Sequence, residues 1–270
     1  MSVAPERGNV LRMRIDGKVV LITGASEGIG AACAAAFRRR GARIALTARS
    51  KEKLDSNAGP DDLAVAADLT VADGRRDIVK RTLDRFGRID ILVNNAGTGL
   101  YAPSWKAPME ATRQMFELNL FAPIEMTQLV VPGMRARRSG TIVNVGSIAG
   151  KVTLPWFTLY SASKHAIGSF TDGLRMELKR DGIHAMTVCP GYVSTGFQKN
   201  VLEGMPPASL QRSRRFAITA EQCAEAIAKG VERDARTVMT PWIGWLLVAA
   251  RHLFPAAIDA RFERIYHHAQ

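Results

Sequence analysis

The chain has 270 residues, 47% of them hydrophobic, and carries a formal net charge of +12. A chain of this kind can bury one large core, so we expect a single domain, and its charge favours acidic partners such as nucleotide phosphates, anionic lipid or an acidic protein. No nucleic-acid-binding motif accompanies the charge. The three cysteines are widely separated, which argues against both a disulfide framework and a metal site. This cysteine usage fits a cytoplasmic location.

The N-terminal residues mix charged and apolar side chains and contain no continuous apolar core. No secretory signal peptide is therefore predicted at this end of the chain. We expect residues 1–14 to form a flexible tail.

Short apolar runs alternate with stretches of helical period from residue 18 onward. Lys18 to Gly24 is rich in β-branched residues and ends at a glycine, and Ala31 to Gly41 has the pattern of a helix with a glycine stop. Runs that are apolar on both faces and separated by helices are typical of an α/β fold, a doubly wound parallel sheet with ligands at the carboxyl ends of its strands. Further strands are predicted at residues 42–48, 63–67, 89–95, 140–147 and 184–190.

The turn after the first strand, TGASEGIG, has glycines in the spacing G-x-x-x-G-x-G. Glycines let the backbone approach a pyrophosphate, whose charge is met by the N–H groups of the following helix. The motif is weak by itself, but its place between a strand and an Ala-rich helix predicts nucleotide binding. The predicted contacts are Gly24, Ser26, Glu27, Gly28, Ile29 and Gly30.

The end of the second strand indicates which dinucleotide binds. Ala48 stands where many dinucleotide folds carry an acid for the ribose hydroxyls, and Arg49 and Ser50 follow it. An arginine can make charge-assisted hydrogen bonds to a 2′-phosphate that an acid would repel, so we predict NADP(H) rather than NAD(H). The alternative is that Arg49 is an ordinary surface residue, and the acidic Glu27 is a mild argument against NADP(H).

Six motifs resemble, in order and spacing, those of the short-chain dehydrogenase/reductase family. They are TGASEGIG, NNAG at residues 94–97, Asn119, Ser147, YSASK at residues 160–164 and PGYVST at residues 190–195. The resemblance covers about residues 15–240, which we predict to be the catalytic domain. It implies a seven-stranded Rossmann-type sheet, a nicotinamide cofactor and a homodimer or homotetramer, and it implies no particular substrate.

Tyr160 and Lys164 are four residues apart, so on a helix they share one face. Taken alone, such a pair fits a solvated helix better than a reaction centre. Hydride transfer to a ketone leaves an alkoxide that needs a proton, and a tyrosine, with an ordinary pKa of roughly 10, could supply it if the Lys164 charge lowered that pKa. We therefore predict Tyr160 as the general acid/base, and the resemblance implies that Lys164 also holds the cofactor ribose.

Two further side chains complete the predicted catalytic set. Ser147 directly follows a strand, thirteen residues before Tyr160, and could donate a hydrogen bond to the substrate oxygen, although a lone serine there would be a turn former. The resemblance implies that Asn119 holds a water in a proton relay from Lys164; taken alone, it would be a helix residue bonded to backbone.

The remaining cofactor contacts come from the resemblance. It implies that Asp68, followed by Leu69, caps the adenine edge, although Asp68 also fits a helix N-cap. The other implied contacts, to the adenosine ribose and to the nicotinamide, are Asn95, Ala96, Gly97, Tyr160, Pro190, Gly191, Val193 and Thr195.

Aromatic residues near the catalytic motifs predict a bulky lipophilic carbonyl substrate. The predicted lining is Trp156, Phe157, Tyr192, Phe197 and Met205, of which Trp156 and Tyr192 join Ser147 and Tyr160 as substrate contacts. Residues 196–218 are predicted to be a mobile lid. The alternative is that several of these aromatics pack in a core or a subunit interface.

Residues 241–270 are predicted to form a C-terminal helical extension. Its uninterrupted apolar stretch, Trp242 to Ala250, is far shorter than the ~20 residues that span a bilayer. It could lie on a membrane surface or pack against a partner subunit, so peripheral membrane contact is an alternative to a purely cytoplasmic protein.

Two classes of function remain. The first is an NADP(H)-dependent oxidoreductase that interconverts a lipophilic ketone and a secondary alcohol, with a 3-oxoacyl thioester on an acidic carrier protein as the rival substrate. The second is a catalytically silent NADP-binding regulator. The presence of Asn119, Ser147, Tyr160 and Lys164 favours the enzyme.

Overall fold

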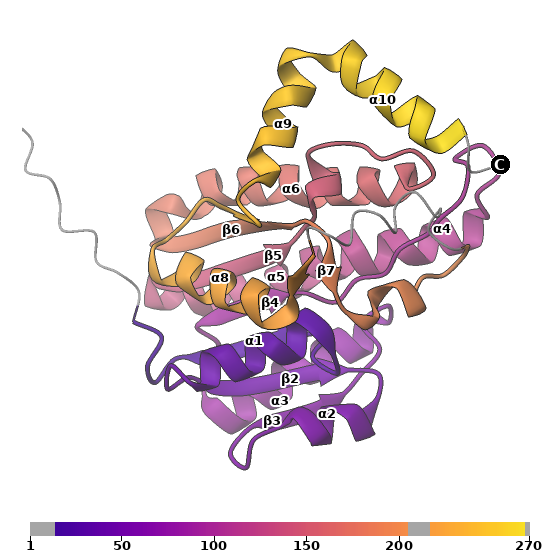
Figure 1. Ribbon diagram of the computed structural model, residues 1–270. Helices are drawn as coiled ribbons and strands as arrows, with labels where there is room; N and C mark the ends of the chain where they lie inside the picture. The colour runs from indigo at the N-terminus through magenta and orange to yellow at the C-terminus, as the bar shows by residue number, and fades with distance from the viewer. Residues whose placement is uncertain (1–13, 205–216, 268–270) are drawn as a thin grey trace, which may run out of the picture.

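The computed structural model describes residues 14–204 and 217–267, so the tail predicted for residues 1–14 lies, apart from Arg14, outside the described residues. Within them, one parallel sheet has seven strands in the order β3-β2-β1-β4-β5-β6-β9 (Figure 1). This confirms the predicted doubly wound sheet. The strands are β1 (Val19–Thr23), β2 (Arg43–Ala48), β3 (Leu63–Ala66), β4 (Ile91–Asn94), β5 (Gly140–Val145), β6 (Ile183–Pro190) and β9 (Thr237–Thr240).

The sheet reverses its winding direction beside its first strand. β1 pairs in parallel with β2 on one side and with β4 on the other. A reversal of this kind opens a crevice at the carboxyl ends of the two central strands. The glycine-rich turn follows β1, and Asn95 to Gly97 follow β4, so the fold brings these two motifs together at that crevice.

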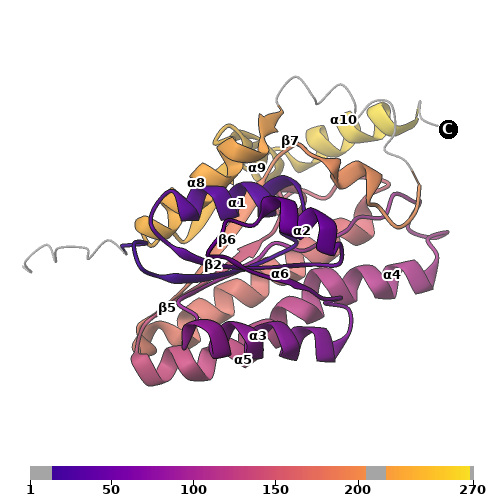
Figure 2. The same ribbon diagram turned by 90° about the horizontal axis from the view of Figure 1, so that it is seen from below.

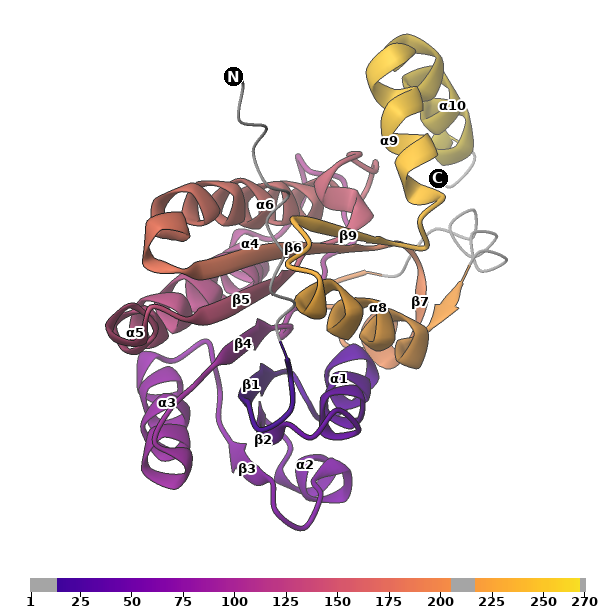
Figure 3. The same ribbon diagram turned by 90° about the vertical axis from the view of Figure 1, so that its left-hand side faces the viewer.

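Helices cover both faces of the sheet (Figures 2 and 3). The apolar sides of α1 (Gly28–Arg38), α2 (Lys51–Asn57) and α8 (Ala220–Glu232) pack on one face. On the other face lie α3 (Ala72–Phe86), α5 (Ala122–Arg137) and α6 (Thr158–Leu178). The π-helical turn η1 (Glu117–Phe121) joins α4 (Met109–Phe116) to α5.

Short elements connect the larger ones. The two-residue strands β7 (Val193–Ser194) and β8 (Ile218–Thr219) pair in parallel outside the main sheet. The 3-10 turns are η2 (Ile148–Gly150), η3 (Lys179–Asp181) and η4 (Gly196–Lys199). Of the lid predicted for residues 196–218, only residues 196–204, 217 and 218 are described.

The C-terminal helices stand beyond the β9 edge of the sheet. α9 (Gly244–Leu253) and α10 (Pro255–His267) form a hairpin that rises from the end of β9 (Figures 1 and 3). Among the described residues, no helix combines the length and the apolar character that crossing a bilayer requires.

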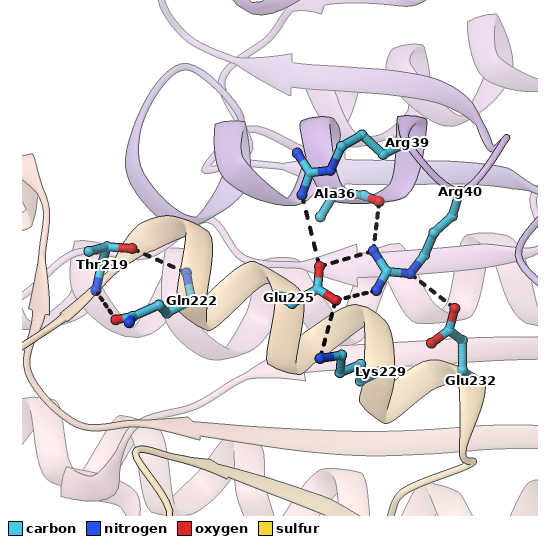
Figure 4. Close-up of polar contacts among 8 residues, drawn as sticks. All are labelled: Ala36, Arg39, Arg40, Thr219, Gln222, Glu225, Lys229 and Glu232. Carbon is cyan, nitrogen blue, oxygen red and sulfur yellow. Dashed lines mark hydrogen bonds and ion pairs between the residues drawn. The ribbon is translucent and has the colours of Figure 1, made fainter.

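An ion cluster joins α1, the helix after the glycine-rich turn, to α8 (Figure 4). The guanidinium of Arg40 lies 2.5 Å from Glu225 Oε1 and 3.0 Å from Glu232 Oε1. Lys229 Nζ lies 3.5 Å from the same Glu225 oxygen. Thr219 and Gln222 form a capping box at the start of α8.

We expect Glu225→Gln to lower the free energy of unfolding at pH 7 by about 1 kcal/mol or less, because this pair is partly exposed. The hydrogen bond from Arg40 lowers the pKa of Glu225 from its ordinary 4.5, so the stabilisation is present above pH 4.5 and is lost as the pH falls below it. Urea unfolding of the parent chain and the variant at pH 7 and at pH 4 measures the stability difference and its dependence on pH. A stability difference that does not shrink on acidification, or an equal effect of Glu263→Gln on exposed α10, would contradict this account.

Candidate active site

A cavity of about 960 Å³ opens at the carboxyl ends of the central strands. It brings together residues that lie far apart in the sequence, including the glycine-rich turn, the end of β2 and the catalytic candidates of α6. All predicted site residues that the structure describes line it, except Gly30, Asn119 and Trp156. Met205, predicted to join the lining, lies outside the described residues.

The glycine-rich turn needs glycine for two different reasons. Gly24 and Gly28 have φ angles of 64° and 57°, the left-handed region that side chains disfavour. Gly30 is needed for close packing instead: a Cβ there would lie 2.2 Å from the carbonyl oxygen of Gly24. Gly30 does not line the cavity, so it supports the turn from behind, and its predicted contact with the cofactor stays a prediction.

The residues around this turn fit a dinucleotide. Helix α1 begins at Gly28, and the N-cap residue Glu27 makes no side-chain hydrogen bond to the first turn of the helix. The helix N-terminus therefore presents backbone N–H groups towards a cavity lined by the glycine turn, which is the arrangement that binds phosphates. In the loop after β4, the Asn95 side chain donates to the carbonyl oxygens of Thr23 and Gly24, so Asn95 also fixes the turn.

Charged side chains line the end of the cavity beyond β2. Arg49 is exposed and lies in the lining together with Ser50 and Lys53. Lys53, on α2, was not predicted; its position two residues inside an exposed helix gave no sequence signal. Its Nζ lies 3.1 Å from Glu27 Oε2, and Glu27 also accepts a hydrogen bond from Asn200. The negative charge of Glu27 is thereby paired.

Asp68 lies in the cavity lining but does not cap a helix. Its Oδ1 accepts hydrogen bonds from the backbone and side chain of Thr70, at 2.9 and 2.8 Å. The N-cap of α3 is Val71, without a side-chain cap. The alternative interpretation of Asp68 as a helix N-cap is therefore wrong, because the helix begins later in the chain.

Tyr160, Ser147 and Lys164 meet in the cavity. Ser147 follows β5 and hydrogen-bonds with the hydroxyl of Tyr160 on α6. Lys164 lies on the same side of α6, with Nζ 5.7 Å from the centre of the Tyr160 ring, and donates to the carbonyl oxygen of Val145 at 3.0 Å. The sequence spacing thus yields a cluster at one point of the cavity.

Burial dominates the pKa values of this cluster. It raises the pKa of Tyr160 to about 12, against a smaller lowering by the Ser147 hydrogen bond. It also lowers the pKa of Lys164 to about 8. The direction for Tyr160 is opposite to the sequence prediction, because desolvation of the phenolate outweighs its neighbours. Tyr160 therefore holds its proton at neutral pH, the state that a proton donor needs.

We expect Lys164→Met to gain stability relative to the parent chain at neutral pH, where the parent must keep a cation buried. The pKa of Lys164 is about 8 in the fold against an ordinary 10.5, so the parent recovers stability as the pH rises from 8 to 10.5. Chemical unfolding of both proteins at pH 7 and pH 10 measures the gap between their free energies of unfolding. A gap that is the same at both pH values would show that Lys164 is not desolvated as described.

Asn119 lies behind the cavity wall, in the π-helical turn η1. Its side chain accepts from the backbone N–H of Thr98 at 2.9 Å and donates to the carbonyl oxygen of Thr98 and to Ser163 Oγ. A Cβ on Gly97 would lie 3.0 Å from Asn119 Oδ1 and 3.3 Å from Lys164 Nζ. Gly97 therefore leaves the space between these two side chains open.

Aromatic rings surround the Tyr160 phenol. Phe157 stacks on Tyr160 with ring centres 4.0 Å apart, and Phe197 approaches its edge at 5.8 Å. Tyr101 stacks on the other side of Phe157 at 4.2 Å. Trp156, predicted as a substrate contact, does not line the cavity; its backbone is left-handed, with φ 63°, and the next residue, Phe157, takes that place.

The segment after β6 closes the opposite wall. Pro190, Gly191, Tyr192, Val193 and Thr195 all line the cavity, as predicted. The C-terminal hairpin adds a wall that the sequence did not indicate, because apolar helix positions there fit a core or an interface equally well. Its lining residues are Pro241, Ile243, Gly244, Leu246, Leu247 and Phe262.

Comparison with known proteins agrees with this geometry. Residues 18–206 match the family model described as short chain dehydrogenase. A protein of Anopheles gambiae named dehydrogenase/reductase SDR family protein 7-like is 33% identical over 90% of this chain and 81% of its own length. The ketoacyl reductase HetN of Nostoc is 31% identical over 93% of this chain and 89% of its own length.

Solved structures that are similar to this one are also short-chain dehydrogenases. A short chain dehydrogenase/reductase from Burkholderia phymatum in complex with NAD aligns with a TM-score of 0.81 and 26% identity, over 89% of this chain and 94% of its own. A short chain dehydrogenase from Burkholderia cenocepacia in complex with NADP aligns with a TM-score of 0.79 and 30% identity, over 93% of this chain and 99% of its own.

Proposed function

Because the chain belongs to the short-chain dehydrogenase/reductase family, we propose that it is an NADP(H)-dependent enzyme that interconverts a lipophilic ketone and a secondary alcohol. The observation that carries this proposal is the meeting of Ser147, Tyr160 and Lys164 in the cavity that the glycine-rich turn also lines. Residues 15–240 would form the catalytic domain, with residues 196–218 as a lid and residues 241–270 as the helical extension.

The roles of the side chains follow from their positions. The bound nicotinamide would supply or accept a hydride. Tyr160, kept protonated by burial, donates a proton to the carbonyl oxygen, while the Ser147 hydroxyl orients that oxygen beside the phenol. Lys164 holds a positive charge next to Tyr160, and we assign to Asn119 the positioning of a water that returns a proton through the gap at Gly97.

Two cations support NADP(H) over NAD(H). Arg49 and Lys53 line the same end of the cavity, where a 2′-phosphate on the adenosine ribose would find charge-assisted donors. Glu27, the residue that argued against NADP(H), is paired with the charge of Lys53 and accepts a hydrogen bond from Asn200. The remaining proposed contacts keep their predicted roles: Ser50, Asp68 and Leu69 at the adenosine, Asn95 to Gly97 at its ribose, and Pro190, Gly191, Val193 and Thr195 at the nicotinamide.

The lining near Tyr160 supports a lipophilic substrate. Phe157 and Phe197 contact the phenol with apolar surface, and Tyr192 lines the same cavity; Ser147, Tyr160 and Tyr192 are the proposed substrate contacts. The proposal includes a homodimer or homotetramer in the cytoplasm, with peripheral membrane contact through the extension as the alternative.

A second candidate substrate is a 3-oxoacyl thioester on an acidic carrier protein. The similarity to a ketoacyl reductase and the net charge of +12 favour it. A cofactor-binding regulator without turnover is the third candidate, and the intact catalytic cluster speaks against it.

Titration of the purified protein with NADPH and NADH, followed by fluorescence, and then oxidation of NADPH against apolar ketones and 3-oxoacyl thioesters, separates these candidates. We expect tighter binding of NADPH and turnover of the ketones. Turnover of thioesters alone would replace the substrate class, and failure to bind either cofactor would refute the proposal.

A further inference from the structure

The C-terminal hairpin begins next to the catalytic serine. Ile148 directly follows Ser147, and a Cβ on Gly244, the first residue of α9, would lie 3.1 Å from Ile148 Cδ1 and 2.7 Å from Met239 Sδ. The glycine allows α9 to start in close contact with the turn after β5. The hairpin therefore sits at the reacting end of the cavity, whereas Arg49 follows β2 on the other side of the sheet order.

The part of the hairpin that faces the cavity is aliphatic and aromatic. Leu246 and Leu247 of α9, its N-cap residue Ile243 and Phe262 of α10 line it, together with Ile148 and Leu154. Among the described lining residues, the carboxylates and cationic side chains are Glu27, Arg49, Lys53, Asp68 and Lys164, and none of them comes from the hairpin. A charged or strongly polar group would therefore find no partner on this wall.

Among the described residues, side chains of the protein cover this wall only in part. Leu247 and Phe262 pack against a small core with Val152 and Val248, whereas Leu246 is 58% exposed although it lines the cavity. An apolar chain laid against Leu246 would remove its surface from water, and burial of apolar area is favourable. Because this wall is continuous with the cavity at Ser147, such an apolar chain would be part of the substrate that reacts there.

We propose that the α9–α10 hairpin binds the aliphatic chain of the ketone substrate, and that Leu246, Leu247 and Phe262 determine the preferred chain length. This assignment rests on the proposed function, because the aliphatic chain is attached to the carbonyl carbon of the ketone held at Tyr160. It narrows the lipophilic substrate to ketones with an unbranched alkyl or acyl chain, and it gives the C-terminal extension a role in specificity.

The test uses NADPH and a series of 2-alkanones from 2-hexanone to 2-tetradecanone with the full chain. We expect kcat/KM to rise by up to about fourfold per added methylene, the equivalent of the ~0.8 kcal/mol of a buried CH2, until the wall is filled. Leu246→Gln should flatten this rise, because each added methylene would then lie against a polar side chain and gain less from burial.

Leu253→Gln is the matched control, since Leu253 lies on the same helix, is 72% exposed and does not line the cavity. It should keep the chain-length dependence of the parent. Turnover of 2-hexanone without any rise along the series, or equal effects of both variants, would overturn the chain assignment and leave the proposed function standing. Absence of turnover on every ketone, together with absence of NADPH binding, would instead refute the function on which it rests.

Discussion

Tyr160→Phe should bind NADPH like the parent chain while its kcat for ketone reduction falls by about 10²–10⁴-fold, the usual contribution of general acid catalysis. The substitution removes only the phenolic oxygen. The ring would still stack on Phe157 at 4.0 Å and meet the edge of Phe197, so the shape of the cavity is kept. Steady-state kinetics and a fluorescence titration with NADPH measure the two effects separately.

Tyr101→Phe is the matched control for this experiment. Tyr101 lies in the same stack, on the other face of Phe157, and also lines the cavity. Removal of its hydroxyl should cost far less turnover than removal of the Tyr160 hydroxyl. Unchanged turnover in Tyr160→Phe would exclude Tyr160 as the proton donor, and a loss of NADPH binding would show that the variant disturbs the site as a whole.

Arg49→Asp should raise the Kd for NADPH by more than about 100-fold, because it removes hydrogen bonds to a charged group, worth about 1.5–3 kcal/mol, and adds a repulsive charge. The Kd for NADH should change little, because NADH has no 2′-phosphate. Isothermal titration with both cofactors gives the ratio of the two Kd values directly.

Lys51→Asp makes the same change of charge two residues away. Lys51 is exposed, forms an ion pair with Asp55 at 2.6 Å and does not line the cavity. It should affect the two cofactors weakly and equally. Equal weakening of NADPH and NADH by Arg49→Asp would remove the specificity assigned to Arg49.

The fold was largely predictable because its strands are short apolar runs that end at glycine or polar residues. The six strands expected from this pattern correspond to β1 to β6. β9 was missed by the pattern, since Thr237–Thr240 is brief and half polar, and only the family resemblance implied a seventh strand. Helix α1 begins at Gly28, three residues before its predicted start.

The site was predictable where spacing along the chain decides position. Tyr160 and Lys164 share a face of α6 because they are four residues apart. Spacing does not report burial, which raises the pKa of Tyr160; the rings that contact Tyr160, Phe157 and Phe197, lie outside the YSASK motif. Spacing also does not tell which of two neighbouring aromatic residues lines the cavity: Phe157 does, and Trp156, whose backbone is left-handed, does not.

The most direct test of the central claim is transfer of deuterium from [4-²H]NADPH to a 2-alkanone by the purified protein, followed by mass spectrometry of the alcohol. Both C4-deuterated stereoisomers of the cofactor should be used, so that the result does not depend on the face of the nicotinamide. We predict one deuterium on the carbinol carbon with one of the two isomers, and about 10²–10⁴-fold less labelled alcohol when Tyr160→Phe replaces the parent chain at equal concentration and time. An NADPH-binding protein that yields no labelled alcohol with either isomer would contradict the account.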